Sequence, residues 1–164
     1  MQPDATKVYS TRQENMIASY LGWETVPASG ARDFNPGDII SDRFLGECKT
    51  HVSHTNNIAI YFDVWAKLDS EAMSQMRVPV LFVDNGTQQA EHTWAILPAT
   101  FAVTEKDIAV GEVDLRLSRT KASFHHFEMK QVLCGMSIGK FKCHRAELAL
   151  MSLATFKYLI EAGV

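Results

Sequence analysis

The sequence predicts an α/β fold in which a central mixed β-sheet is flanked by helices. Residues 11–21 and 57–76 place apolar side chains at helical spacing. Residues 36–49 alternate like a two-stranded hairpin, and 77–84 form a short apolar run typical of a strand buried on both faces. Because helices and strands alternate along the chain, we expect the helices to pack on one shared sheet.

Length and composition are typical of a soluble globular protein. With 164 residues, 46% hydrophobic and 21% charged, the chain is expected to form one domain over 1–164. A core at 10–98 would be followed by a C-terminal extension at 99–164. No apolar run approaches the roughly 18 residues of a membrane span, so no membrane partner is expected. Three cysteines, without an apolar signal core in residues 1–10, predict free thiols in the cytoplasm.

The first helix is predicted at 11–21, and Gly22 is expected to end it. Glu14 has a structural interpretation here. Thr11 followed three residues later by Glu14 fits a capping box, in which the glutamate reaches back to the N-terminal backbone. Arg12 on the same turn is a candidate phosphate contact, although a solvated arginine fits equally well.

A strand is predicted at 23–26, and Pro27 ends its regular pairing. The small residues 28–31 then form a turn that contains Ser29. Arg32, in the polar loop that follows, is a second candidate phosphate contact.

The hairpin at 36–49 brings charged side chains together. With the turn centred between Asp42 and Arg43, Asp38 lies opposite Glu47, on the face that also presents Lys49. Two carboxylates suit a hard divalent cation, and an adjacent ammonium group can orient a water molecule. The alternative is structural: Asp38 as a turn residue, and Glu47 with Lys49 as a surface ion pair that stabilises little.

The later elements are predicted from apolar spacing and turn residues. Asn56 is expected to cap the second helix, and Pro79 requires local adjustment of pairing in the strand at 77–84. The remaining expected elements are a strand at 92–98, one or two short strands within 101–117 and a buried helix at 145–162.

Charge is distributed unevenly along the chain. Residues 1–100 contain 7 Lys/Arg and 12 Asp/Glu, whereas 101–164 contain 9 and 7, although the net charge is −3. The segment 116–145 is basic and contains interleaved aromatic residues, which suits a nucleic-acid surface but also suits a peripheral lobe with solvated lysines. The candidate DNA contacts in it are Arg116, Arg119, Lys121, Lys130, Lys140 and Lys142.

The ordered acidic pattern resembles a known nuclease family. Pro36-Gly37-Asp38, eight further residues and then Glu47-Cys48-Lys49 resemble the PD-(D/E)xK signature. More narrowly, Glu14, the Ser29 turn, Asp38, Glu47 and Lys49 together resemble archaeal-type Holliday junction resolvases, which phages also encode. The resemblance covers 12–84, about half of the chain.

The resemblance implies a metal-dependent endonuclease of DNA recombination and repair that resolves four-way junctions by paired phosphodiester hydrolysis. It implies a homodimer acting in the cytoplasm of a bacterial, archaeal or phage-infected cell, with Mg²⁺ as cofactor and Mn²⁺ able to substitute. The implied catalytic residues are Glu14, Ser29, Asp38, Glu47 and Lys49. The implied metal ligands are Glu14, Asp38, Glu47 and the backbone carbonyl of Cys48.

Two other functions remain open. The same catalytic set would serve a restriction-like or repair endonuclease acting on linear, flapped or mismatched DNA. A DNA-binding protein that keeps the nuclease fold without activity is the other alternative, and the intact set of Asp38, Glu47 and Lys49 argues against it. The slightly acidic chain also departs from the resolvases it resembles, which tend to be strongly basic.

Overall fold

The computed structural model describes residues 4–27, 37–102 and 107–163. Within these residues the strands form an eight-stranded sheet in the order β1-β2-β3-β5-β6-β11-β10-β7, and a three-stranded sheet in the order β4-β9-β8. The large sheet is mixed, because β3 runs parallel to β5 and β7 runs parallel to β10, whereas the other pairs are antiparallel. Its strands are β1 (Glu24–Thr25), β2 (Ile39–Ile40), β3 (Phe44–Lys49), β5 (Val78–Asp84), β6 (Thr93–Pro98), β11 (Ala146–Ser152), β10 (Ser137–Cys143) and β7 (Ala109–Glu112). The small sheet contains β4 (Asn57–Tyr61), β9 (Lys121–His125) and β8 (Arg116–Leu117).

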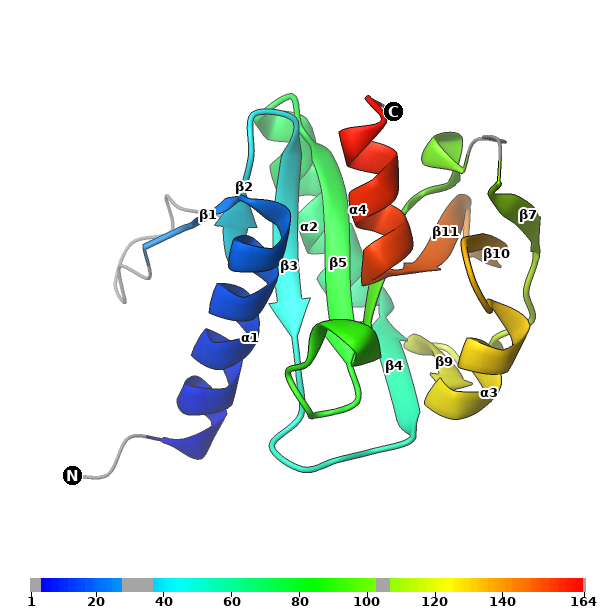
Figure 1. Cartoon of the computed structure of the whole chain (residues 1–164), viewed down its shortest axis with the longest axis horizontal. Helices are drawn as coiled ribbons and strands as arrows, with labels where there is room; N and C mark the ends of the chain where they lie inside the picture. Colours follow the sequence, from blue (N-terminus) through cyan, green and yellow to red (C-terminus); the bar gives the residue numbers. More distant parts are fainter. Residues whose placement is uncertain (1–3, 28–36, 103–106, 164) are drawn as a thin grey trace.

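Helices cover both faces of the large sheet, as the sequence predicted for an α/β fold. In Figure 1, α1 and α4 lie in front of the central strands and α2 lies behind them. The helices are α1 (Ala5–Leu21), α2 (Phe62–Ser74), α3 (His126–Val132) and α4 (Leu153–Glu161), with short 3₁₀ turns η1 (Ala90–His92) and η2 (Ala99–Phe101). Among the described helices, none combines the length and apolar character needed to cross a lipid bilayer.

Alternate side chains of the central strands pack into two separate hydrophobic cores, one on each face of the sheet. Leu45 of β3 packs with Trp65 and Leu68 of α2 and with residues of the small sheet. Its neighbour Phe44 faces the other way and packs with Ile17 of α1 and Phe156 of α4. Period-2 alternation in β3 therefore fixes which of its side chains meet α1 and which meet α2.

The hairpin that precedes the candidate site has the predicted register. Ile39 pairs with Gly46 and Ile40 with Leu45, and the backbone N–H of Ser41 donates to the carbonyl of Phe44 at 3.0 Å. Asp38 therefore lies across from Glu47, as the alternation of the sequence predicted. The proline in β5 is also accommodated, because pairing of β5 with β6 begins only at Leu81.

The first helix begins earlier than predicted. Asp4 caps it by accepting a hydrogen bond from the backbone N–H of Thr6 at 3.0 Å, and Gly22 ends it in the left-handed conformation with φ of 72°. Thr11 and Glu14 thus lie inside α1. The capping-box interpretation of Glu14 is wrong, because the backbone N–H of Thr11 lies inside the helix and is not a free group at its N-terminus.

Residues 57–61 form strand β4 and not the start of a helix. Ile58 and Ile60 are buried on alternate positions, and Ile58 pairs with Phe124 of β9. Asn56 does not cap the helix, which begins at Phe62. The helical interpretation failed because apolar residues in a strand that leads directly into a helix can also fall at helical spacing.

The segment predicted as one long final helix is a strand followed by a helix. β11 lies between β6 and β10, so all four residues 148–151 are buried. A strand buried on both faces has no polar face, and periodicity cannot distinguish it from a buried helix. Ser152 separates the two elements by accepting a hydrogen bond from the backbone N–H of Thr155 at 3.1 Å.

Candidate active site

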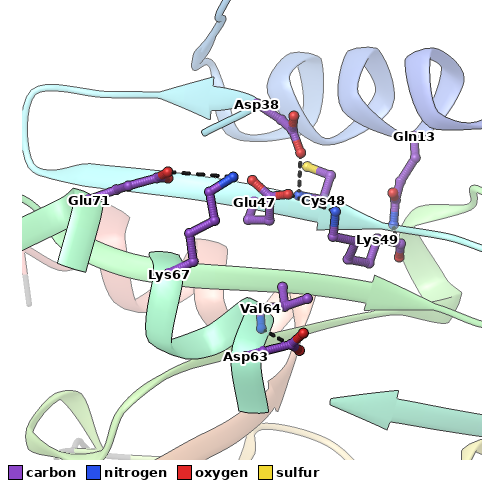
Figure 2. Close-up of polar contacts among 9 residues, drawn as sticks. All are labelled: Gln13, Asp38, Glu47, Cys48, Lys49, Asp63, Val64, Lys67 and Glu71. Atoms are coloured by element: carbon purple, nitrogen blue, oxygen red, sulfur yellow. Dashed lines mark hydrogen bonds and ion pairs between the residues drawn. The ribbon is translucent and has the colours of Figure 1, made fainter. Parts of the chain in front are cut away.

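Four of the predicted site residues lie on neighbouring elements beside β2 and β3 of the central sheet. Asp38 immediately precedes β2, Glu47 and Lys49 lie on β3, and Glu14 lies on α1. The charges of Asp38, Glu47 and Lys49 are all near enough to Glu14 to change its pKa. Figure 2 shows Asp38, Glu47 and Lys49 around β3, with α1 on one side and α2 on the other.

Asp38 is held in place by the backbone of the neighbouring strand. Its Oδ2 accepts a hydrogen bond from the backbone N–H of Cys48 at 2.8 Å, and its own N–H donates to the carbonyl of Gly46 at 2.8 Å. These two bonds follow from the hairpin register. The carboxylate is therefore oriented by the main chain and does not depend on a flexible side-chain partner.

Glu47 and Lys49 form the ion pair that their alternation on β3 predicted. Lys49 Nζ lies 2.8 Å from Glu47 Oε1, and the side chains are 51% and 21% exposed for Lys49 and Glu47 respectively. Burial lowers the pKa of Lys49, but the hydrogen bond and charge of Glu47, together with the charge of Asp38, outweigh it and raise the pKa. The ammonium group thus stays charged at the mouth of the site.

Glu14 and Asp38 hold protons more tightly than ordinary carboxyl groups. Burial and the charges of Asp38 and Glu47 raise the pKa of Glu14 to about 7, against a smaller opposing effect of Lys49. Burial and the charge of Glu47 raise the pKa of Asp38 to about 6, although the Cys48 N–H and Lys49 act in the opposite direction. Clustered carboxyl groups with raised pKa values are a common property of functional sites.

Gln13 is a buried residue of this region that the sequence did not reveal. Its Nε2 donates to the backbone carbonyl of Lys49 at 2.7 Å, which ties α1 to the end of β3. Among the described residues its Oε1 is buried without a hydrogen-bond partner. The signal in the sequence was weak: Gln13 precedes Ile17 by four residues and so lies on the buried stripe of the helix.

The chain leaving Lys49 is fixed by a buried polar network. Thr50 Oγ1 donates to Asp84 Oδ1 at 2.6 Å, and Gln88 Nε2 donates to Thr50 Oγ1 at 2.9 Å. Asp84 also accepts from the backbone N–H groups of Gly86 and Gln88, at 3.1 and 2.7 Å. The ends of β3 and β5 are thereby joined directly beside Lys49.

The candidate metal ligands Asp38 and Glu47 have different hydrogen-bond and charge partners. Asp38 is bonded to the Cys48 N–H, and Glu47 is paired with Lys49. In the part of the chain that the structure describes, no three histidine, cysteine, aspartate or glutamate side chains converge in a geometry suited to a metal ion. The Cys48 side chain is buried on the face opposite Glu47, as its alternation predicted.

Two predicted residues of the site region, Ser29 and Arg32, lie outside the described residues. Arg12 is exposed on α1, and its guanidinium carbon lies 5.5 Å from the centroid of the Tyr9 ring.

The predicted basic segment divides into groups with different surroundings. Lys121 Nζ lies 5.7 Å from the centroid of the Tyr61 ring, at the end of β4. In the strand register, Lys140 lies opposite Glu112 of β7, and Lys142 lies opposite Glu147 of β11. Two further cations, Arg116 and Arg119, are exposed on the β8–β9 hairpin. Lys130 on α3 donates to the carbonyl of Glu91 at 3.1 Å.

Comparison with known proteins does not identify a family. No protein-family model matches this chain, and neither the curated proteins nor the solved structures give a match. The chemistry of the acidic cluster is therefore the basis for assigning a function.

Proposed function

We propose that this protein is a Mg²⁺-dependent endodeoxyribonuclease of the PD-(D/E)xK type that resolves four-way DNA junctions. The main support is the juxtaposition of Asp38, Glu47 and Lys49 with Glu14 at one edge of the sheet. Hydrolysis of a phosphodiester bond needs oxygen ligands for a cation and a positive group beside the phosphate. The cluster offers both: the carboxyl groups of Glu14, Asp38 and Glu47, and the ammonium group of Lys49.

The donor chemistry of the cluster fits magnesium. Carboxylate oxygens are the ligands that Mg²⁺ prefers in proteins. Burial and neighbouring negative charge raise the pKa values of Glu14 and Asp38, and a bound cation would offset both effects. Glu14, Asp38 and Glu47 would hold the ion with the Cys48 carbonyl, and Mn²⁺ can replace it. When bound, the metal supplies a Lewis acid that activates water and stabilises the leaving oxygen.

The protein's own residues position the reacting groups. Lys49 presents its ammonium group to the phosphate and offsets the charge that develops in the transition state. Gln13 fixes the backbone of Lys49 from the side of α1, and the Cys48 N–H fixes Asp38. We assign Ser29 to placement of the scissile phosphate, following the family resemblance.

Binding of the junction is assigned to the exposed cations. Arg12 and Arg32 would contact phosphates near the cut, and the candidates of the C-terminal half would follow the arms of the junction. A homodimer would provide the two active sites that paired cuts require. We place the enzyme in the cytoplasm, where its three free cysteines would stay reduced.

A nuclease acting on linear, flapped or mismatched DNA is the second candidate. The net charge of −3 favours it, because a strongly basic surface is expected of a protein that binds four DNA arms. An inactive DNA-binding protein is disfavoured, because its carboxylates and lysine would have no reason to remain clustered.

Cleavage of an end-labelled four-way junction with Mg²⁺, beside a linear duplex of the same arm sequence, tests the proposal. Paired nicks at symmetric positions in the junction, with the duplex uncut, are the expected result. Equal cutting of both substrates would leave the nuclease chemistry standing and overturn junction resolution. If neither is cut with Mg²⁺ or Mn²⁺, the nuclease proposal is wrong.

A further inference from the structure

A small apolar pocket opens directly beside the candidate active site. Its volume is about 130 Å³, and more of its lining is apolar than polar. The floor consists of Ile58, Leu81 and Val83, all buried in the core between the two sheets. Lys49 and Tyr61 stand at its rim. The pocket thus shares one residue, Lys49, with the acidic cluster.

The position of the pocket relates it to the DNA strand that would be cut. Lys49 and Glu47 project from the same face of β3 as Leu45, towards α2 and the small sheet. A phosphate held at this cluster would place a neighbouring nucleotide over the opening of the pocket.

The rim of the pocket has the chemistry of a nucleotide site. Tyr61 is 45% exposed, although the preceding Ile60 is fully buried. Lys121 Nζ lies 5.7 Å from the centroid of the Tyr61 ring and provides a cation for a flanking phosphate. Exposed aromatic rings beside cations are the usual means by which proteins hold unstacked bases.

We propose that this pocket receives one unstacked base of the DNA strand whose phosphate lies at the acidic cluster. The inference rests on the proposed nuclease function and deepens it by naming the feature of the substrate that is recognised. A base must leave the helical stack to enter an apolar pocket, and this costs least where the duplex is already interrupted. The pocket would therefore favour branched DNA over a continuous duplex.

Junctions that contain 2-aminopurine at single positions beside the cut test this directly, because the fluorescence of that base rises when it leaves the stack. Binding is measured without divalent metal, so that no strand is cut. Ala59 lines the pocket and is only half-buried, so Ala59→Leu would fill the pocket with little effect on the core. Ala109→Leu, at an exposed position of strand β7, is the matched control.

The wild-type protein and Ala109→Leu should raise the fluorescence at one position beside the cut. Ala59→Leu should abolish the rise and slow junction cleavage about tenfold, within the range expected for loss of one stacked base. Tyr61→Ala should act in the same way, whereas Tyr61→Phe should retain the rise. The comparison of Tyr61→Ala with Tyr61→Phe tests base binding in the pocket even if Ala59→Leu fails to fold.

Two results would overturn the inference, and they are distinguishable from failure of the nuclease proposal. Junction cleavage by the wild type without a fluorescence change at any flanking position would exclude the pocket and leave the nuclease intact. Equal losses in Ala59→Leu and Ala109→Leu would show a general effect of the substitutions. If the wild type cuts no DNA at all, the nuclease proposal falls and the pocket assignment falls with it.

Discussion

Gly46 is the residue that allows β2, which directly follows Asp38, to pair closely with β3, which carries Glu47. A Cβ atom at this position would lie 2.6 Å from Ile39 Cγ1 and 3.0 Å from Phe82 Cε2. Both neighbours are fully buried, so neither can move away at low cost. The missing side chain therefore permits the close pairing that sets Asp38 across from Glu47.

Gly46→Ala is expected to destabilise the protein by about 1–3 kcal/mol, the usual cost of overpacking a core. Gly111→Ala is a matched control on another strand, since a Cβ there meets no atom within 4 Å. Urea unfolding should show a lower midpoint for Gly46→Ala and a midpoint close to wild type for Gly111→Ala. Equal midpoints for the two variants would contradict the steric explanation.

At the scale of elements, the proposed function predicts that the β8–β9 hairpin contributes more to DNA binding than strand β10. Lys121 lies beside Tyr61 at the pocket, and Arg119 is exposed in the turn of the hairpin. On β10, Lys140 and Lys142 each lie opposite a glutamate in the register of the sheet. This neighbouring negative charge would reduce their attraction for phosphate.

The double substitution Arg119→Ala/Lys121→Ala should weaken junction binding and reduce the salt slope by about 0.9 for each phosphate that is no longer neutralised. Lys140→Ala/Lys142→Ala removes the same charge and should change affinity less. Binding titrations at several salt concentrations measure both effects. A larger decrease in affinity for the β10 pair would contradict this assignment and place the DNA along β10.

The elements that could be predicted from sequence are those fixed by local pattern. The hairpin register follows from alternation on either side of one polar turn, and this grouped Asp38, Glu47 and Lys49 correctly. β4 and β11 were missed because their character depends on partners far along the chain: β9 for one, β6 and β10 for the other. Gln13 was missed for the same reason, since its partner is a backbone carbonyl 36 residues away.

At the scale of the whole molecule, the acidic cluster opposes folding at neutral pH. The pKa of Glu14 is raised from 4.5 to about 7 and that of Asp38 from 3.8 to about 6. The folded chain therefore binds more protons than the unfolded chain between these values. The stabilising effect of protonation is complete below the unfolded pKa values and is lost as the pH rises through the folded ones. His126 acts in the opposite direction, because burial and the charge of His92 lower its pKa to about 4.

Comparison of Glu14→Gln with wild type measures the contribution of Glu14 to the pH dependence of stability. Without metal the two proteins should melt at similar temperatures at pH 4, below the unfolded pKa of Glu14. At pH 8 the variant should melt on the order of a few degrees higher, because it has no charge to bury. Mg²⁺ at pH 8 should raise the melting temperature of wild type more than that of the variant. If the difference in melting temperature between the two proteins does not change with pH, the proposed cost of the Glu14 charge is wrong.

The central claim is that the acidic cluster hydrolyses DNA, and single-turnover cleavage of a four-way junction with Mg²⁺ tests it most directly. The comparison is between wild type, Glu47→Gln and the control Glu112→Gln, which alters an exposed glutamate on strand β7. Glu47→Gln should bind the junction as wild type does but cut it at least about 10²-fold more slowly, the scale of removing one electrostatic interaction at a reaction centre. Glu112→Gln should cut at the wild-type rate. Wild-type turnover by Glu47→Gln would contradict the assignment and place the chemistry elsewhere in the molecule.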